Sequence, residues 1–257
     1  MGVALEVRGA VAILTLDNPG KLNALSIEML DGIDTHLDTV EGDEAVHAVV
    51  ITGAGEKAFA AGADIGHMRE ATVEEARAYA ERGHEVFAYI EAFPKPVIAA
   101  VNGFALGGGC ELVLACDIRL ASDNARLGQP EVNLGIFPGW GGTQRLPRLT
   151  SPGFAKELIF TGRHVTAEEA KAAGLVNHVY PQAELLDRAV AMGEEIAKKS
   201  PLAVSVAKDL VNQALEGDYK EALARELSAF GDAFATDDQR EGMAAFFEKR
   251  EARFTGR

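Results

Sequence analysis

Cysteine is scarce in this chain of 257 residues, which contains only Cys110 and Cys116. The two residues are six positions apart and are separated by the apolar run Leu112–Ala115, a pattern typical of buried thiols. A disulfide framework of the kind that holds small secreted proteins together needs more cysteines than this. We therefore expect free, buried thiols and a cytoplasmic location.

Positive charge is also scarce. The chain has 25 Lys and Arg residues against 39 Asp and Glu residues, which gives a formal net charge of −14. A nucleic-acid-binding surface needs a basic patch that neutralises phosphates, and the sequence has none. The same charge opposes binding to an anionic membrane surface. We expect neither nucleic acid nor membrane as a partner, and an anionic substrate would have to be attracted locally against the overall field.

Long apolar runs and metal-binding clusters are missing as well. The longest apolar runs fall far below the ~20 residues of a membrane span, and a strand pattern begins at once, so we expect no signal peptide. The six histidines form no i,i+4 pair on a helix and no cluster with cysteine, so we expect no metal site. A serine hydrolase is disfavoured, because the Gly-x-Ser-x-Gly motif is absent.

What remains is the composition of an ordinary globular protein, 47% hydrophobic and 25% charged, which can bury a sizeable core. Up to about Val179 the pattern alternates between strands and helices in repeating β-β-α units. We predict strands at 3–7, 11–16, 47–52, 97–101 and 117–121, the first two forming a hairpin. We predict helices after the capping residue Ser26, at about 72–93, and from Gly108 or Gly109 to Ala115.

The pattern changes at about Gln182 and is almost entirely helical from there, with Pro201 in the first turn of one helix after Ser200. We therefore predict an α/β unit over residues 1–181 and an α-helical region over 182–257. The helical region has more apolar positions than a short core obviously covers, which predicts self-association. The alternative is that they pack the region on its own core. These positions are Leu202, Val204, Val206, Leu210, Val211, Leu215, Leu223, Leu227, Phe230 and Phe234.

Two glutamates stand in unusual contexts. Glu111 follows three successive glycines, 107–109, and Glu131 follows Gly128-Gln129-Pro130. Glycines let backbone amides approach a ligand closely, and two carboxylates can supply an acid/base pair, so the combination suits proton transfer next to a carbonyl. The apolar residues among 132–137 argue against full exposure of Glu131. The alternatives are a surface carboxylate at 131, a helix-dipole partner at 111, and glycines that serve only helix entry or packing.

These two segments, with Lys57-Ala58-Phe59-Ala60-Ala61-Gly62-Ala63-Asp64-Ile65 upstream, resemble the signature of the crotonase superfamily and, within it, of the enoyl-CoA hydratases. The match runs from the turn at residues 18–25 to residues 246–250. The resemblance implies a crotonase-type spiral of β-β-α units with a C-terminal helical trimerisation region. It also implies a homotrimer or homohexamer, and no metal or redox cofactor, because coenzyme A arrives as part of the substrate.

The activity implied by the resemblance is reversible syn addition of water to trans-2-enoyl-CoA, giving 3-hydroxyacyl-CoA. The amides of Ala63 and Gly108 would bind the thioester oxygen, Glu111 would activate the water, and Glu131 would deliver a proton to C2. Family hydratases often carry a small residue where Trp140 stands, which leaves the acyl preference open. Substrate and coenzyme A contacts are implied at Lys21, Ala24, Lys57, Ala61, Asp64, Ile65, Gly139, Trp140 and, from a neighbouring subunit, Phe247 and Lys249. The alternative for Lys21 and Lys57 is that both are ordinary solvated lysines.

Three other functions remain open from the sequence. A Δ3,Δ2-enoyl-CoA isomerase moves one proton and adds no water, and the presence of both Glu111 and Glu131 favours hydration over it. A non-catalytic scaffold is disfavoured by the same two residues, although the fold alone would not exclude it. An NAD-dependent oxidoreductase is suggested by the glycine-rich segment 53–58. A dinucleotide-binding loop has to be followed directly by a helix, however, and the segment that follows contains Gly62, which fits poorly in a helix.

Overall fold

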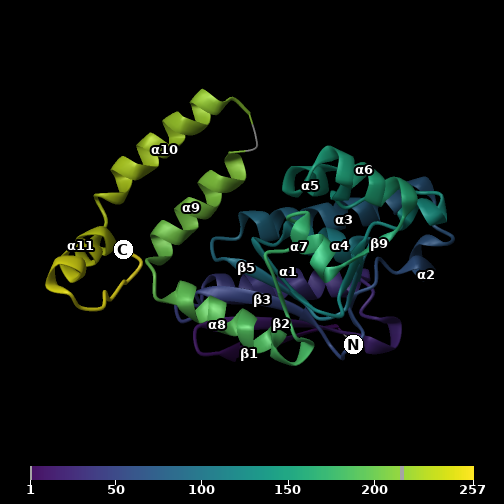
Figure 1. The fold of residues 1–257 in the computed structure, drawn as a ribbon, viewed down its shortest axis with the longest axis horizontal. Coiled ribbons are helices and arrows are strands. Elements are labelled where there is room, and N and C mark those ends of the chain that lie inside the picture. Colours follow the sequence, from purple (N-terminus) through teal and green to yellow (C-terminus); the bar gives the residue numbers. More distant parts are fainter. Residues whose placement is uncertain (1, 215–216) are drawn as a thin grey trace.

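The computed structural model describes residues 2–214 and 217–257. It has an α/β core and a helical arm that reaches away from it (Figure 1). One sheet has the order β1-β2-β3-β5-β7-β10 and the other β4-β6-β8-β9. The first sheet contains β1 (Gly2–Arg8), β2 (Val11–Asp17), β3 (Ala48–Gly53), β5 (Val97–Val101), β7 (Ile118–Ser122) and β10 (His178–Tyr180). The second contains β4 (Ala58–Ala60), β6 (Phe104–Leu106), β8 (Arg126–Gly128) and β9 (His164–Thr166).

Most neighbouring strands are parallel, the exceptions being the hairpin β1-β2 and the pair β8-β9. The α-helices of the core are α1 (Ile27–Glu41), α2 (Ile65–Met68), α3 (Val73–Ala92), α4 (Gly108–Ala115), α5 (Gly142–Leu149), α6 (Pro152–Thr161), α7 (Ala167–Ala172) and α8 (Leu185–Ala197). The 3-10 turns are η1 (Pro19–Lys21), η2 (Glu131–Leu134) and η3 (Gln182–Glu184).

The chain repeats one pattern as it winds through the core. It passes through a strand of the first sheet, then a strand of the second, and then a helix: β3-β4-α3, β5-β6-α4 and β7-β8-α5. The predicted β-β-α units are therefore confirmed. Because β4, β6 and β8 are neighbours in the second sheet, the loops that follow them lie near one another.

Local sequence signals explain where several helices begin. The hydroxyl of Ser26 accepts from the Met29 N–H and caps α1. Thr72 and Glu75 form a reciprocal capping box at the start of α3, which satisfies amides that have no partner inside the helix. Ser200 caps α9 (Pro201–Gln213), in which Pro201 is the first residue. The predicted helix starts at these positions are confirmed.

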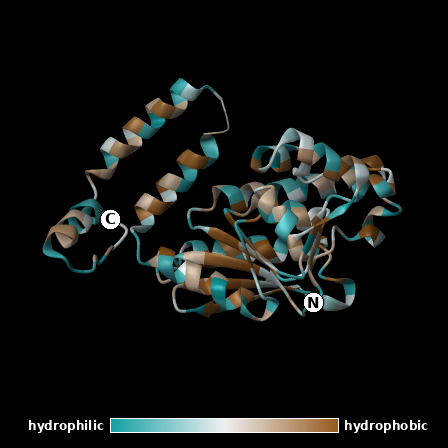
Figure 2. Cartoon of the chain, viewed as in Figure 1, coloured by the Kyte–Doolittle hydropathy of each residue, from teal (hydrophilic) through white to brown (hydrophobic). Residues whose placement is uncertain are grey.

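The central strands β3 and β5 of the first sheet are buried on both faces, which accounts for their continuous apolar sequences. One face packs against α1 and the large cluster that includes Leu30 and Phe87, and α8 covers the other through Leu185 and Ala189. Figure 2 shows the hydrophobic residues concentrated along these strands. Cys110 and Cys116 are free and buried, as predicted.

The C-terminal helices α9 (Pro201–Gln213), α10 (Tyr219–Ala233) and α11 (Asp237–Glu248) form the arm. Several of the apolar side chains that we singled out are exposed on it, among them Val211, Leu227 and Phe230 at 68%, 75% and 66%. Leu215 lies outside the described residues. The division after residue 181 stays a prediction, and α8, just beyond it, packs on the sheet of the core.

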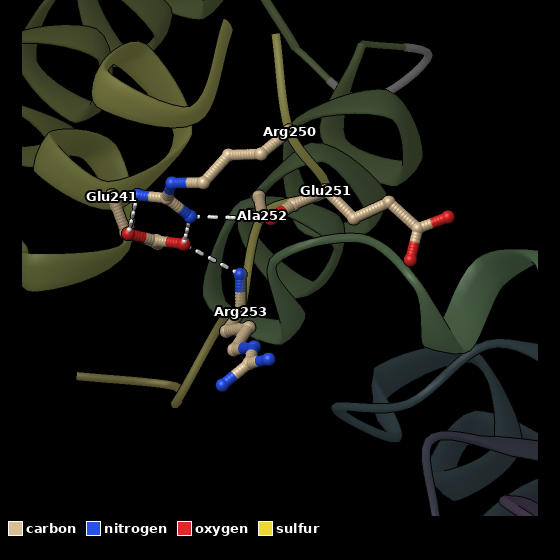
Figure 3. A pocket seen from close by; sticks show the side chains of 5 residues that line it. All are labelled: Glu241, Arg250, Glu251, Ala252 and Arg253. Carbon is tan, nitrogen blue, oxygen red and sulfur yellow. Dashed lines mark hydrogen bonds and ion pairs between the residues drawn. The ribbon is translucent and has the colours of Figure 1, made fainter. Parts of the chain in front are cut away.

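A polar surface hollow near the end of the arm is shown in Figure 3. Arg250 makes a two-point ion pair with Glu241, at 2.6 and 2.9 Å, and the Arg253 N–H donates to the same carboxylate at 2.7 Å. These bonds lower the pKa of Glu241 to about 2. They tie the segment after α11 back onto that helix.

None of the helices formed by residues 2–214 and 217–257 is long and apolar enough to cross a membrane.

Candidate active site

The site begins where the turn after β2 meets the segment after β4. The Leu25 N–H donates to the Gly62 carbonyl at 2.8 Å, and the Asp64 N–H donates to the Leu25 carbonyl at 3.1 Å. Lys21 forms an ion pair with Asp64 at 2.8 Å, although the lysine side chain remains 61% exposed. This pair lowers the pKa of the Asp64 carboxyl. Two segments about forty residues apart are thus held in a fixed register.

Asn23 holds this turn in place, a role that the sequence did not suggest. It is fully buried and has a left-handed backbone with φ of 56°, a conformation unusual for residues other than glycine. Its side chain donates to the carbonyls of Ala54 and Ala58 at 3.0 and 2.8 Å and accepts from the Asn18 N–H at 2.9 Å. These bonds offset the backbone strain and fix the loop that carries Lys21.

The glycines at the start of α4 allow a close approach to the segment after β4. A Cβ on Gly109 would collide with the Ala60 carbonyl oxygen, and a Cβ on Gly108 would lie 3.3 Å from the Ala63 nitrogen. Neither the Ala63 nor the Gly108 N–H donates to any residue that the structure describes. Two unpartnered amides from distant segments therefore lie close together, one of them at a helix N-terminus.

Glu111 lies in the first turn of α4 and is 2% exposed. Its Oε1 accepts from the Trp140 N–H at 2.8 Å and from the Gly142 N–H at 2.7 Å. Burial disfavours the charged form and raises the pKa of the carboxyl to about 7, while the two amides and the charge of Arg145 act in the opposite direction.

Glu131 opens η2 and is partly buried. A Cβ on Gly107 would lie 3.2 Å from its Oε1, so the carboxylate lies against the glycine loop. The buried Gln129 amide, with its nitrogen toward Glu131, donates to both carboxylate oxygens at 2.9 and 3.2 Å. Burial and, next, the charge of Glu111 raise the pKa of Glu131 to about 8.

The apolar residues that follow Glu131 in the sequence do not cover it, contrary to our expectation. Leu134, Ile136 and Phe137 are 54%, 45% and 70% exposed. Glu131 is covered instead by the glycine loop and by Gln129. The sequence offered one signal for Gln129, its position two residues before Glu131, directly after the strand β8.

Arg145 is a second residue that the sequence analysis missed. Its guanidinium donates to the Trp140 carbonyl at 2.8 Å and to both oxygens of Glu91 at 2.8 and 2.5 Å. It thus fastens the loop 140–142, whose amides hold Glu111, to helix α3. A signal was present, because Arg145 lies in the first turn of a helix that opens with the flexible pair Gly141-Gly142.

Other predicted site residues lie in the same loops. Lys57 is exposed just before β4, Ile65 is exposed at the start of α2, Gly139 is exposed before α5, and Ala24 and Ala61 are partly buried. Phe247 and Lys249 are exposed at the end of α11, on the arm and far from α2 in Figure 1. Within one chain they are not brought to the glutamates.

The dinucleotide-binding interpretation of residues 53–58 is wrong. The loop after β3 leads directly into the strand β4 and not into a helix, so no helix N-terminus is present to receive a pyrophosphate. Among the described residues, no group of three or more His, Cys, Asp or Glu side chains is placed to hold a metal ion.

Comparison with known proteins identifies the family of this chain. The sequence profile of the family described as enoyl-CoA hydratase/isomerase matches residues 6–257. The chain belongs to this family. It is 50% identical to a short-chain-enoyl-CoA hydratase of Clostridium acetobutylicum, a match that covers 96% of this chain and 95% of that protein. It is 49% identical to a crotonyl-CoA hydratase of Syntrophomonas wolfei, covering 98% and 97%.

Solved structures in the family have the same fold. The crystal structure of an enoyl-CoA hydratase from Bacillus anthracis superposes with a TM-score of 0.96 at 40% identity, covering 99% of both chains. An enoyl-CoA hydratase structure from Geobacillus kaustophilus gives a TM-score of 0.94 at 41% identity, covering 99% of this chain and 98% of that one. The predicted crotonase-type α/β fold is therefore confirmed.

Proposed function

We propose that this member of the family is an enoyl-CoA hydratase, which adds water reversibly to a trans-2-enoyl-CoA to give the 3-hydroxyacyl-CoA. One observation carries the proposal: two carboxylates with raised pKa values lie beside the two unpartnered amides of Ala63 and Gly108. The relatives at about half identity are named as hydratases of short enoyl thioesters, which supports the same reaction here.

The two amides are suited to the charge that the reaction creates. When water adds to C3 of an enoyl thioester, negative charge builds on the thioester oxygen. Donors already aimed at that oxygen stabilise the charge without reorganising, and the N-terminus of α4 contributes its dipole at Gly108. The close approach of Gly108 to the Ala63 nitrogen supports an oxygen bound by both amides.

The two glutamates divide the proton chemistry. Two backbone amides and the charge of Arg145 favour the ionised form of Glu111, which takes a proton from the attacking water. Burial and the charge of Glu111 favour the protonated form of Glu131, which delivers its proton to C2. The charge of Glu111 is one cause of the raised pKa of Glu131, so the ionisation of one glutamate keeps the other protonated. Between its two ionisations the pair then holds one proton.

The substrate is a coenzyme A thioester, and coenzyme A is itself an anion. Lys21 is exposed in the turn that packs beside the segment after β4, and Lys57 is exposed just before β4, so both ammonium groups can attract phosphates against a net charge of −14. Exposed Ile65 and Ile136 belong to the segments that carry Ala63 and Glu131, and they offer apolar surface to the thioester. No cofactor beyond the coenzyme A of the substrate enters this scheme.

Self-association is the second part of the proposal. Exposed apolar side chains on α9 and α10, such as Val211, Leu227 and Phe230, favour self-association through the arm, and the family resemblance makes a homotrimer or a pair of trimers the assembly that we propose. In such an assembly Phe247 and Lys249 of one subunit would reach the coenzyme A site of a neighbour. A cytoplasmic location remains part of the proposal, on the basis of the two free thiols.

The function is tested by following the loss of conjugated-thioester absorbance when purified protein is added to crotonyl-CoA. We expect hydration, with 3-hydroxybutyryl-CoA as the product identified by chromatography and mass. A parallel assay with 3-enoyl-CoA measures isomerisation. Faster isomerisation than hydration would overturn the proposal in favour of an isomerase.

A further inference from the structure

The side chain of Trp140 packs between two helices of the core, at a position that we call the seat of the indole. It is 4% exposed, and its indole N–H donates to the Tyr79 carbonyl in α3 at 3.2 Å. The indole meets the rings of Tyr79 and Phe87 edge to face, with centroids 5.0 and 5.7 Å apart. The indole is therefore fixed in position by packing and by one hydrogen bond.

Gly83 makes this seat possible. It lies in the interior of α3, where glycine destabilises a helix relative to alanine, and its φ is not positive, so the backbone does not require glycine. A Cβ at this position would lie 2.5 Å from the Cδ1 and Cε2 atoms of Trp140 and would collide with the indole nitrogen. Accommodation of the indole thus explains a glycine that the helix itself disfavours.

The opposite edge of the indole borders the candidate active site. A Cβ on Gly108 would lie 2.5 Å from Cζ3 and 2.6 Å from Cε3 of Trp140, and 3.3 Å from the Ala63 nitrogen. The ring edge therefore lies beside both amides that would hold the thioester oxygen. The backbone N–H of the same tryptophan binds Glu111. The indole fills the space between α3 and α4 beside the two amides that would bind the thioester oxygen.

We propose that Trp140, seated on Gly83, sets the length of acyl chain that the site accepts. This inference rests on the proposed hydratase function. A crotonyl group ends close to the carbons that react, whereas a longer chain has to continue past them and meets a ring that close packing prevents from moving. Short unbranched enoyl-CoA thioesters are the substrate class, and an indole-sized space opens when the ring is removed.

The experiment compares kcat/KM for crotonyl-, 2-hexenoyl-, 2-octenoyl- and 2-decenoyl-CoA in the wild type, Trp140→Phe and Trp140→Ala. We expect the wild-type value to fall by at least about tenfold from crotonyl to octenoyl, a discrimination of the size that pocket contacts give. Trp140→Ala should raise the octenoyl-to-crotonyl ratio by at least about tenfold, and Trp140→Phe should give an intermediate ratio. Phe160→Leu is the control, because Phe160 is an aromatic residue of α6 that is 71% exposed; its ratio should stay at the wild-type value.

The seat itself is tested by a double-mutant cycle on thermal stability. Gly83→Ala should lower the melting temperature of the wild type, because the new methyl group displaces the indole, and should leave unchanged or raise that of Trp140→Ala. Equal effects in both backgrounds would overturn the pairing of the two residues.

The outcomes separate this inference from the function on which it rests. If the wild type does not hydrate crotonyl-CoA, the proposed function fails. If it does so but also hydrates decenoyl-CoA equally well, or if the ratio is unmoved in both tryptophan variants, only the chain-length role fails. Trp140→Phe keeps an aromatic ring in the seat, so the test stands even if Trp140→Ala does not fold.

Discussion

Arg145 and Glu91 form a two-point ion pair that joins α5 to α3, with distances of 2.8 and 2.5 Å between their nitrogen and oxygen atoms. The arginine side chain is only 13% exposed, and its remaining terminal nitrogen donates to the Trp140 carbonyl. The amides of that same loop bind Glu111. A surface ion pair contributes little to stability, but this one fixes the loop that orients a candidate catalytic carboxylate.

Arg145→Gln should therefore lower kcat by about tenfold with a smaller effect on KM. Its loss should also move the acid limb of the pH–rate profile to higher pH, because the guanidinium charge lowers the pKa of Glu111. Steady-state kinetics from pH 5 to pH 9 measure both effects. Arg148→Gln, an exposed position on the same helix, is the control and should leave the profile unchanged. A fall in kcat without movement of the acid limb would restrict Arg145 to a packing role.

Glu111→Gln and Glu131→Gln should each lower kcat by at least about 10²-fold while the fold is kept, the usual loss when a general acid or base is removed. Glutamine preserves the shape of each side chain but can neither accept nor supply the proton. Circular dichroism and crotonyl-CoA hydration are measured on the same preparations, with the exposed Glu168→Gln as control. Normal turnover in either purified variant would remove that residue from the mechanism.

The raised pKa values also predict how stability depends on pH. The pKa of Glu131 is about 4.5 in the unfolded chain and about 8 in the folded protein. At a pH between these two values, Glu131 is therefore protonated more often in the folded state than in the unfolded state. Stability contributed by this group is present below pH 4.5 and is lost as the pH rises through 8. Glu131→Gln should therefore raise the melting temperature at pH 8.5 relative to wild type by at least about 2 °C, which corresponds to ~1 kcal/mol in a protein of this size. The difference should shrink at pH 5, and equal differences at the two pH values would contradict the assigned shift.

Lys21→Ala and Lys57→Ala should raise KM for crotonyl-CoA with little change in kcat, since a contact to phosphate is the same in the ground state and in the transition state. The dependence of KM on salt should also become shallower, because one ionic contact is lost. Lys171→Ala, an exposed lysine on α7, is the control. A lysine variant whose KM equals the wild-type value at every ionic strength does not contact the phosphates.

Leu227→Asp should break the proposed assembly. It replaces an apolar side chain that is 75% exposed in the single chain with a carboxylate, which would be buried without a partner in the interface between subunits. Light scattering should give a trimeric or hexameric mass for the wild type and a lower mass for the variant. Activity should fall with the mass if Phe247 and Lys249 complete a neighbour's site. A monomeric, fully active wild type at micromolar concentration would refute both the assembly and the shared site.

Local signals were enough to predict part of the fold. Hydrophobic periodicity predicted the hairpin and the longer strands of the first sheet, and the Ser26 cap predicted the start of α1, since these depend on neighbours a few residues away. No residue range was predicted for the short strands of the second sheet. The glycine run before Glu111 and the segment around Glu131 indicated the family, because backbone approach and acid/base chemistry require particular residue types.

Contacts between distant residues had no signal in the sequence and emerge from the tertiary structure. The approach of Gly108 to the Ala63 nitrogen, the hold of Gln129 on Glu131, and the use of Gly83 to seat Trp140 all join segments whose separation along the chain carries no local signal. The same is true of burial at Glu131, where the adjacent apolar residues are exposed and the covering groups come from elsewhere. Periodicity reports which face of an element is apolar, whereas the pKa of a carboxylate depends on every charge and amide packed around it, and folding alone assembles that set.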